Sequence, residues 1–220
     1  NIMLTTLIVV SFFAFFMLNS SVFAVNSTIT FFPPDSNPYG LSYAEHTKNF
    51  WKWILSFPID KNPWEDAVGS NCDNGQSKSN SSIFYLSGNG GGISERKCIV
   101  PAGKSLFIPI SQVEVSDKEV PHASPDDLIR IAKNDQDSVT SLYLSINDKI
   151  YDREELNNYR INTGVFDVFF PKDAIFGVTE GTSKAAADGY YIITKPIDKG
   201  NYTIQYKSSL MCLSIDCLEP

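Results

Sequence analysis

Acidic residues gather in one short stretch of the chain and suggest a site for a hard cation. Glu114, Asp117, Glu119 and His122 follow one another closely in the sequence. Calcium takes about six to eight oxygen ligands, and these carboxylates with nearby backbone carbonyls would supply part of such a set. The stretch lacks the glycine and the spacing of an EF-hand loop, so a solvated loop is the alternative. We take these four residues as candidate metal ligands, with calcium as the candidate ion, and the sequence assigns no cofactor.

Tryptophans provide a second candidate site. Trp51, Trp53 and Trp64 lie close in sequence, and Asp66 follows the last of them. Exposed in a groove, indole rings would stack on sugars or anchor a protein partner. Packed inside, they would belong to the core, which we expect for Trp51. The sequence leaves Trp53 and Trp64 open between these two roles, and Trp53, Trp64 and Asp66 are the candidate ligand-binding residues.

Nucleophilic catalysis has little support in the sequence. A serine or cysteine nucleophile usually needs a histidine base oriented by an acid, and the only histidines are His46 and His122. The Gly-x-Ser-x-Gly nucleophile elbow is absent. Paired carboxylates for glycoside cleavage cannot be recognised by spacing, because the separation that matters is spatial. No catalytic residue is therefore assigned, and whether the chain is an enzyme stays open.

The cysteines favour an oxidising environment. Cys72, Cys98, Cys212 and Cys217 have no zinc-site spacing and no histidine beside them. Four cysteines are compatible with several pairings, and we favour Cys72–Cys98 together with Cys212–Cys217. Disulfides persist mainly outside the cytosol, so this pairing predicts an exported protein.

The N-terminal segment also predicts export. Residues 1–24 contain an uncharged apolar run from Leu4 to Leu18, followed by small residues at Val22 and Ala24 that fit a signal-peptidase site. The run is shorter than the roughly 20 apolar residues of a bilayer span. No lysine or arginine precedes it, and an uncleaved anchor is the alternative. We expect a secreted, extracellular or cell-surface protein, attached to the membrane only if this segment is retained.

Composition and charge exclude other classes. With 43% hydrophobic and 20% charged residues, the chain has the composition of a globular protein rather than a disordered one. Its net charge of −7 would repel phosphate backbones, so nucleic acid is not an expected partner. Sequons begin at Asn26, Asn80 and Asn201 and mark candidate glycosylation sites on an exported chain.

Two helices are predicted by their capping residues. Ser42 has the capping-box form and precedes a helix over 43–56, whose apolar residues recur at helical spacing. Ser124 followed by Pro125 and two acids predicts a helix over 124–134.

The rest of the chain has the pattern of short strands separated by turns. Runs rich in Phe, Tyr and Ile predict strands. We place these strands at 82–87, 93–100, 105–110, 141–146, 149–151, 165–170, 189–194 and 201–207, with one helical turn at 154–158. Pro109 indicates an edge strand or a strand end, and 112–121 is predicted to be irregular.

These elements define one mainly β domain. Residues 25–41 form an extended lead-in, and 42–220 form a single β-rich domain. We expect a sandwich or jelly-roll type of fold, tied by disulfides, with one N-terminal helix and one or two short helices.

Several motifs in this order resemble a known kind of protein. They include Trp51-Lys52-Trp53, Asn62-Pro63-Trp64-Glu65-Asp66, Phe84-Tyr85-Leu86-Ser87-Gly88, Arg96-Lys97-Cys98, Val100-Pro101-Ala102-Gly103-Lys104 and Asp188-Gly189-Tyr190-Tyr191. The combination is similar to a family of uncharacterised secreted microbial proteins, bacterial and archaeal, that have β-rich folds and no established activity. The resemblance implies export and a β-rich fold, and it carries over no catalytic residue.

Two functions follow as expectations. The first is a non-catalytic extracellular or cell-surface module that binds a glycan or a protein partner. The alternative is a secreted hydrolase that uses carboxylates or a divalent metal.

Overall fold

The computed structural model describes residues 29–76 and 81–211. The predicted signal segment, the sequons at Asn26 and Asn80, and the proposed Cys212–Cys217 bridge lie outside these residues, so they stay predictions. No helix among the described residues is long and apolar enough to cross a membrane.

The described chain is mainly β, with strands in two sheets and three α-helices. One sheet has the order β1-β2-β6-β5 and the other the order β4-β3-β7. The strands are β1 (Ile83–Tyr85), β2 (Ser105–Ser116), β3 (Val139–Ile146), β4 (Lys149–Tyr151), β5 (Arg160–Phe170), β6 (Gly181–Ile193) and β7 (Ile204–Leu210). The helices are α1 (Tyr43–Ile54), α2 (Pro125–Asp137) and α3 (Arg153–Asn157), with 3₁₀ turns at Pro38–Gly40, Ile59–Lys61 and Ile175–Gly177.

The predicted caps begin the two long helices. The hydroxyl of Ser42 accepts a hydrogen bond from the backbone N–H of Glu45 at the start of α1. At α2, Ser124 and Asp127 form a complete capping box with Pro125 in the first turn. Each such cap satisfies backbone donors that a helix leaves unpaired at its N-terminus.

The central strand β2 corrects one sequence interpretation. Pro109 does not mark a strand end, because β2 continues through it to Ser116. The pairing with β1 covers only Ser105–Phe107, so at Pro109 the only strand partner among the described residues is β6, as expected for an edge position. The register with β6 shifts between Pro109 and Ser111. A bulge of this kind accommodates a residue that has no N–H to donate, and it allows the 112–116 part, predicted to be irregular, to be strand.

A second strand prediction is also wrong. Residues 93–100 are extended but belong to neither sheet. Exposed and partly buried side chains alternate along this segment, which explains the strand-like pattern of its sequence. Their backbone bonds are made instead to the loop after α1, where Glu95 and Lys97 donate to the carbonyls of Ala67 and Val68.

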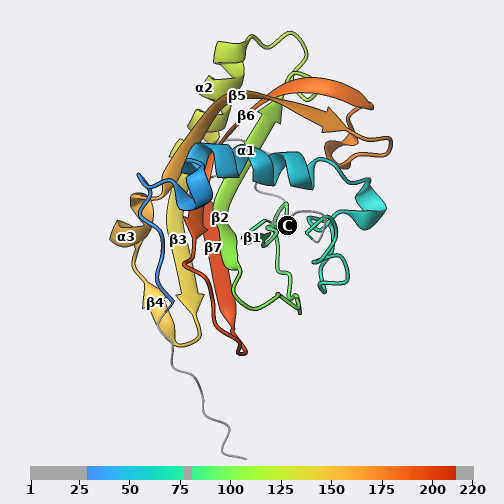
Figure 1. Ribbon diagram of the computed structural model, residues 1–220. Coiled ribbons are helices and arrows are strands. Elements are labelled where there is room, and N and C mark those ends of the chain that lie inside the picture. The colour runs from blue at the N-terminus through green and yellow to red at the C-terminus, as the bar shows by residue number, and fades with distance from the viewer. Residues whose placement is uncertain (1–28, 77–80, 212–220) are drawn as a thin grey trace, which may run out of the picture.

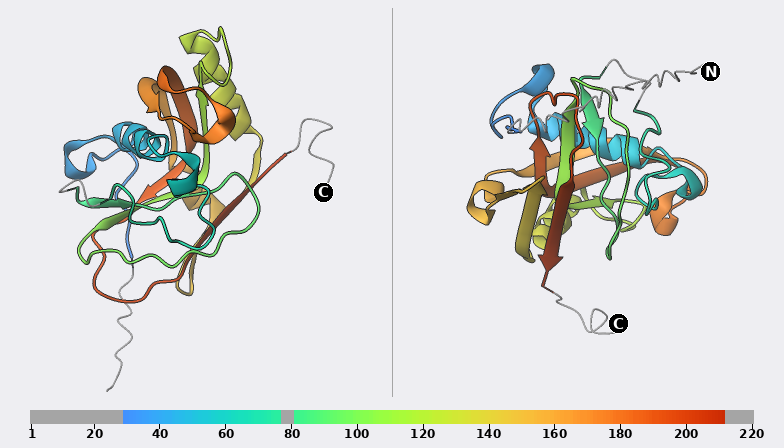
Figure 2. Two further views of the ribbon diagram at one scale, coloured as in Figure 1. Left: turned by 90° about the vertical axis from the view of Figure 1, so that its right-hand side faces the viewer. Right: turned by 90° about the horizontal axis from the view of Figure 1, so that it is seen from below.

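The two faces of the four-stranded sheet are covered differently. On one face, Leu128 and Ala132 of α2 pack against Val115 and Ala186. On the other face, α1 joins the main core through buried side chains that include Phe50, Trp51 and Ile54. Figure 1 shows α1 lying across the strands, and Figures 1 and 2 show the long loops between α1 and β2 gathered to one side of them.

Candidate functional site

Trp53 and Trp64 lie in the core rather than in an open groove. They are 9% and 8% exposed. The indole N–H of Trp53 donates to the carbonyl of Asn74 at 2.8 Å, and its ring stacks on Tyr85 with centroids 5.3 Å apart. The ring of Trp64 packs between those of Trp51 and Phe176. The question that the sequence left open is therefore answered in favour of packing.

The carboxylate of Asp66 forms hydrogen bonds within its own loop. The residue is buried, and its carboxylate accepts backbone N–H bonds from Val68, Gly69 and Asn71 at 2.7–3.1 Å. Burial alone would raise its pKa, but these backbone donors outweigh burial and lower the pKa. Trp53, Trp64 and Asp66 thus stabilise the loop. The three side chains are buried, so they do not present the exposed surface that the predicted ligand-binding role requires.

Arg96 is the residue that sequence reasoning did not single out. Its guanidinium donates to four backbone carbonyls, those of Asp66, Ser87, Gly88 and Trp64. One side chain thereby ties three segments of the chain together. A lone arginine two residues before a cysteine is too weak a pattern to reveal such a role.

Replacing Arg96 with alanine is expected to lower the free energy of unfolding by about 2 kcal/mol, because hydrogen bonds to a charged donor are lost and carbonyl oxygens are left unpaired. Arg96→Lys should restore little, since an ammonium cannot reproduce the planar fork. Urea unfolding at neutral pH measures the difference. Lys97→Ala, at the exposed neighbouring position, is the control and should change stability by less than about 0.5 kcal/mol.

The Cys72–Cys98 disulfide is confirmed. It joins two segments whose Cα atoms at these residues are 5.6 Å apart. Together with Asp66 and Arg96, it fixes the loop after α1 against the extended segment that precedes β2.

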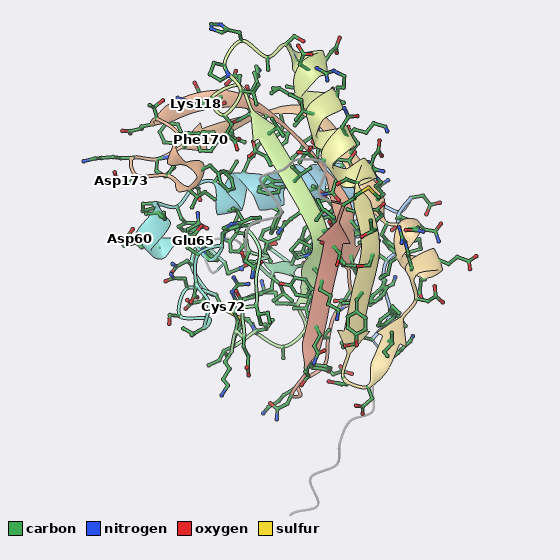
Figure 3. All side chains as sticks on the ribbon, turned by 180° about the vertical axis from the view of Figure 1, so that it is seen from behind. Asp60, Glu65, Cys72, Lys118, Phe170 and Asp173 are labelled. Carbon is green, nitrogen blue, oxygen red and sulfur yellow. A yellow bond between two sulfur atoms is a disulfide. The ribbon has the colours of Figure 1, made fainter. Side chains whose placement is uncertain are left out.

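Beside this disulfide lies a hollow of about 600 Å³. We call it the disulfide hollow. It is lined by three parts of the chain, namely Gly69, Ser70, Cys72, Asp73 and Gln76 of the loop, Ile83 and Phe84 of β1, and Lys97, Ile99, Pro101 and Lys104 of the segment that leads into β2. Figure 3 shows Asp60, Glu65 and Cys72 together on this side of the molecule. A volume of this size is within the range of ligand sites.

Gln76 closes the free edge of β1 at the floor of the hollow. Its amide Nε2 donates to the carbonyl of Tyr85 at 2.7 Å, and its Oε1 accepts from the N–H of the same residue at 3.1 Å. The side chain thus substitutes for a neighbouring strand. The floor is held in place by hydrogen bonds, and the hollow is preformed.

The predicted metal ligands are only partly brought together. Asp117 accepts hydrogen bonds from Ser183 and from the backbone of Lys184, and His122 is an exposed residue in a left-handed turn. Among residues 29–76 and 81–211, no group of three or more His, Cys, Asp and Glu side chains is placed to hold a metal ion. Of the four predicted ligands, Glu114 and Glu119 interact with each other, and the metal-binding role of the set stays a prediction.

Glu114 is buried and Glu119 is half-buried, and the two acids interact. Burial raises the pKa of Glu114 well above its ordinary value, and the negative charge of Glu119 adds to the rise. Burial also raises the pKa of Glu119, although hydrogen bonds from Ser116 oppose this. Two carboxyl groups so placed resist ionising together.

The raised pKa of Glu114 predicts a pH dependence in buffer that contains EDTA. Above the ordinary carboxyl pKa of 4.5, the folded protein binds more protons than the unfolded chain, so the free energy of unfolding falls as pH rises towards the folded pKa. Glu114→Gln removes this fall, and its stability relative to the wild type should increase from pH 4.5 upward. Urea midpoints measured between pH 4 and about pH 8 test this; parallel curves for the two proteins would contradict it.

His46 has a structural role. It is buried, and its Nε2 lies 2.8 Å from the carbonyl oxygen of Pro38. Burial lowers the pKa of the imidazole. This residue fastens the lead-in to α1.

Comparison with known proteins identifies no relative. No family model matches the chain, and neither a curated protein nor a solved structure does. The resemblance to uncharacterised secreted microbial proteins stays a prediction.

Proposed function

We propose that this protein is a non-catalytic extracellular binding module and that its ligand is held in the disulfide hollow. One observation carries the proposal: contacts within the chain hold the walls of the hollow in place, whereas side chains on its lining are exposed to solvent. The walls are tied by the Cys72–Cys98 bond, Asp66 and Arg96. Lys97 and Ile99 on the lining are exposed, the latter at 91%. Preformed walls reduce the entropy lost when a ligand binds.

Between a glycan and a protein, the lining favours a protein segment. Sugar rings bind to exposed aromatic faces, and the only aromatic side chain on the described lining, Phe84, is buried. Ile99 and Pro101 offer aliphatic surface instead. The lining carries Lys97, Lys104 and one acid, Asp73, and Lys104 donates to the carbonyl of Ser81. The net positive charge within a chain of net charge −7 favours a segment that carries acidic as well as aliphatic residues.

The setting of the module is part of the same proposal. A disulfide and the absence of a membrane-spanning helix among the described residues are compatible with an extracellular protein. We also propose that the two sheets close over the shared core in the manner of a sandwich. The core cluster supports this arrangement, because it contains residues of both sheets.

Selection from a displayed peptide library, with a glycan array in parallel, tests the function. We expect peptides with acidic and aliphatic residues to bind the wild type. Affinity should fall at least about tenfold in the double variant Lys97→Glu, Ile99→Asp, since charge and apolar contact are both lost. The matched control is Lys149→Glu, Ile150→Asp, which makes the same changes at exposed positions on β4. Peptides bound equally by both double variants, or binding of glycans alone, would contradict the proposal.

A carboxylate hydrolase is the second candidate, because Glu114 and Glu119 face each other with raised pKa values. One carboxyl that keeps its proton beside one that ionises is the arrangement used for acid–base catalysis. Turnover of a polysaccharide, peptide or ester that is abolished by Glu119→Gln would replace the first proposal with this one.

A further inference from the structure

One face of β2 points away from α2 and carries two polar side chains. Gln112 and Glu114 are two residues apart on the strand and pair with Gly189 and Ala187 of β6. Side chains two apart on a strand point to the same face. Val113 and Val115 point to the opposite face, where they pack against α2. Gln112 and Glu114 therefore lie together on the side of the main core.

Three buried oxygens on this face receive no hydrogen bond from the described residues while Glu114 and Glu119 are both ionised, although a protonated Glu114 shares one with Glu119. They are Oε1 of Gln112 and both carboxylate oxygens of Glu114. Glu114 as a whole is only 6% exposed. Buried polar groups are nearly always paired, so a cluster of orphan acceptors indicates that something rich in positive charge or in donors is bound there.

Glu119 brings a second carboxyl group to the same place from the turn after β2. Its Oε2 accepts from the backbone N–H of Ser116 at 3.0 Å and from the hydroxyl of Ser116 at 2.5 Å. These bonds fix the carboxyl group and leave its other oxygen available. Glu119 lies within hydrogen-bonding reach of the carboxyl group of Glu114.

The loop at Gly88 lies directly over the amide of Gln112. A Cβ atom at residue 88 would lie 2.0 Å from Nε2 of Gln112, so a larger residue there would require this side chain to move. Trp64 borders the same spot. The cover keeps water from the acceptors and makes an ion that neutralises them more favourable.

We propose that Gln112, Glu114 and Glu119 bind a hard divalent cation of the calcium type. The site offers carboxylate and amide oxygens without sulfur or imidazole, which is the ligand set of calcium rather than of zinc or copper. It retains Glu114 and Glu119 of the sequence prediction, replaces Asp117 and His122, and adds Gln112. The proposal is independent of the function assigned to the disulfide hollow.

Calorimetric titration of the full chain with Ca²⁺, after dialysis against EDTA, tests the site. We expect wild-type protein to bind one equivalent and to unfold at a higher temperature when Ca²⁺ is present. Glu114→Gln, which keeps the shape of the side chain and removes its charge, should weaken binding at least about tenfold. His122→Ala is the matched control from the original prediction and should bind as the wild type does.

Two results would overturn the site. One is wild-type protein that shows neither heat of binding nor a shift in unfolding temperature with Ca²⁺, Mg²⁺ or Mn²⁺; a proton shared by the two acids would then account for the pair. The other is a folded Glu114→Gln variant that binds as the wild type does. If that variant does not fold, Glu119→Gln on the turn provides the same comparison, and wild-type affinity there would equally overturn the proposal.

Discussion

Replacing Arg160 with alanine should lower the free energy of unfolding by about 3 kcal/mol, one of the two largest effects we expect from the side chains described here. Its Nε donates to the carboxylate of Asp188 at 2.8 Å, and the side chain of Asp188 is only 3% exposed. Without Arg160, that carboxylate retains the amide of Asn162 and loses its counter-charge. An uncompensated buried charge is far more costly than a lost surface ion pair.

Urea unfolding at neutral pH measures this effect. Arg130→Ala is the control, because Arg130 makes an ion pair with Asp127 in which both side chains are exposed, and its loss should cost less than about 0.5 kcal/mol. Adding Asp188→Asn to Arg160→Ala should recover part of the stability. If Arg160→Ala lowers the free energy of unfolding no more than the control does, Asp188 is not a buried charge that depends on Arg160, and the prediction is wrong.

Removing the Cys72–Cys98 bond should cost about 3 kcal/mol in the double variant Cys72→Ser, Cys98→Ser. The bond closes a loop with a sequence separation of 26, and cross-linking a loop of that length restricts the unfolded chain. It also joins the segments that line the disulfide hollow, so peptide binding should weaken in the same variant.

Paired measurements separate these two consequences. Urea unfolding reports the stability, and peptide affinity at low temperature, where the variant is folded, reports the geometry of the hollow. The wild type and the double variant, both reduced with dithiothreitol, should match each other in both measurements. Unchanged stability after the double substitution would show that the bond does not constrain the unfolded chain.

Local signals in the sequence predicted local structure well. Ser42 and Ser124 were recognisable as caps because the residues that complete each cap lie within one turn. The Cys72–Cys98 pair was the simplest of the possible pairings and is confirmed. The mainly β character followed from the density of short apolar runs.

Features that depend on distant partners could not be predicted. Pro109 is tolerated within β2 because β1 does not extend to it and because the register against β6, far away in the sequence, shifts beside it. Residues 93–100 alternate like a strand, yet their backbone pairs with the loop after α1. Alternation reports only which side chains face solvent, and it does not report the partner that the backbone finds.

The candidate sites show the same limit. The acidic stretch contained Glu114 and Glu119, whereas Gln112, which shares a face of β2 with Glu114, was recognisable only from the strand register. Trp53 and Trp64 gave no sign of burial, because their packing partners Tyr85 and Phe176 come from later elements. The sequence shows which residue types are present and how far apart they lie along the chain. Only the fold determines which of these side chains come into contact.

The most direct test of the disulfide hollow as the ligand surface is amide hydrogen exchange of the full chain with and without the tightest-binding selected peptide. We predict that the peptide slows exchange at 69–76 and 97–104, the loop and the segment that line the hollow. Slower exchange confined to the β4-β3-β7 sheet, or no slowing at the hollow, would contradict the account.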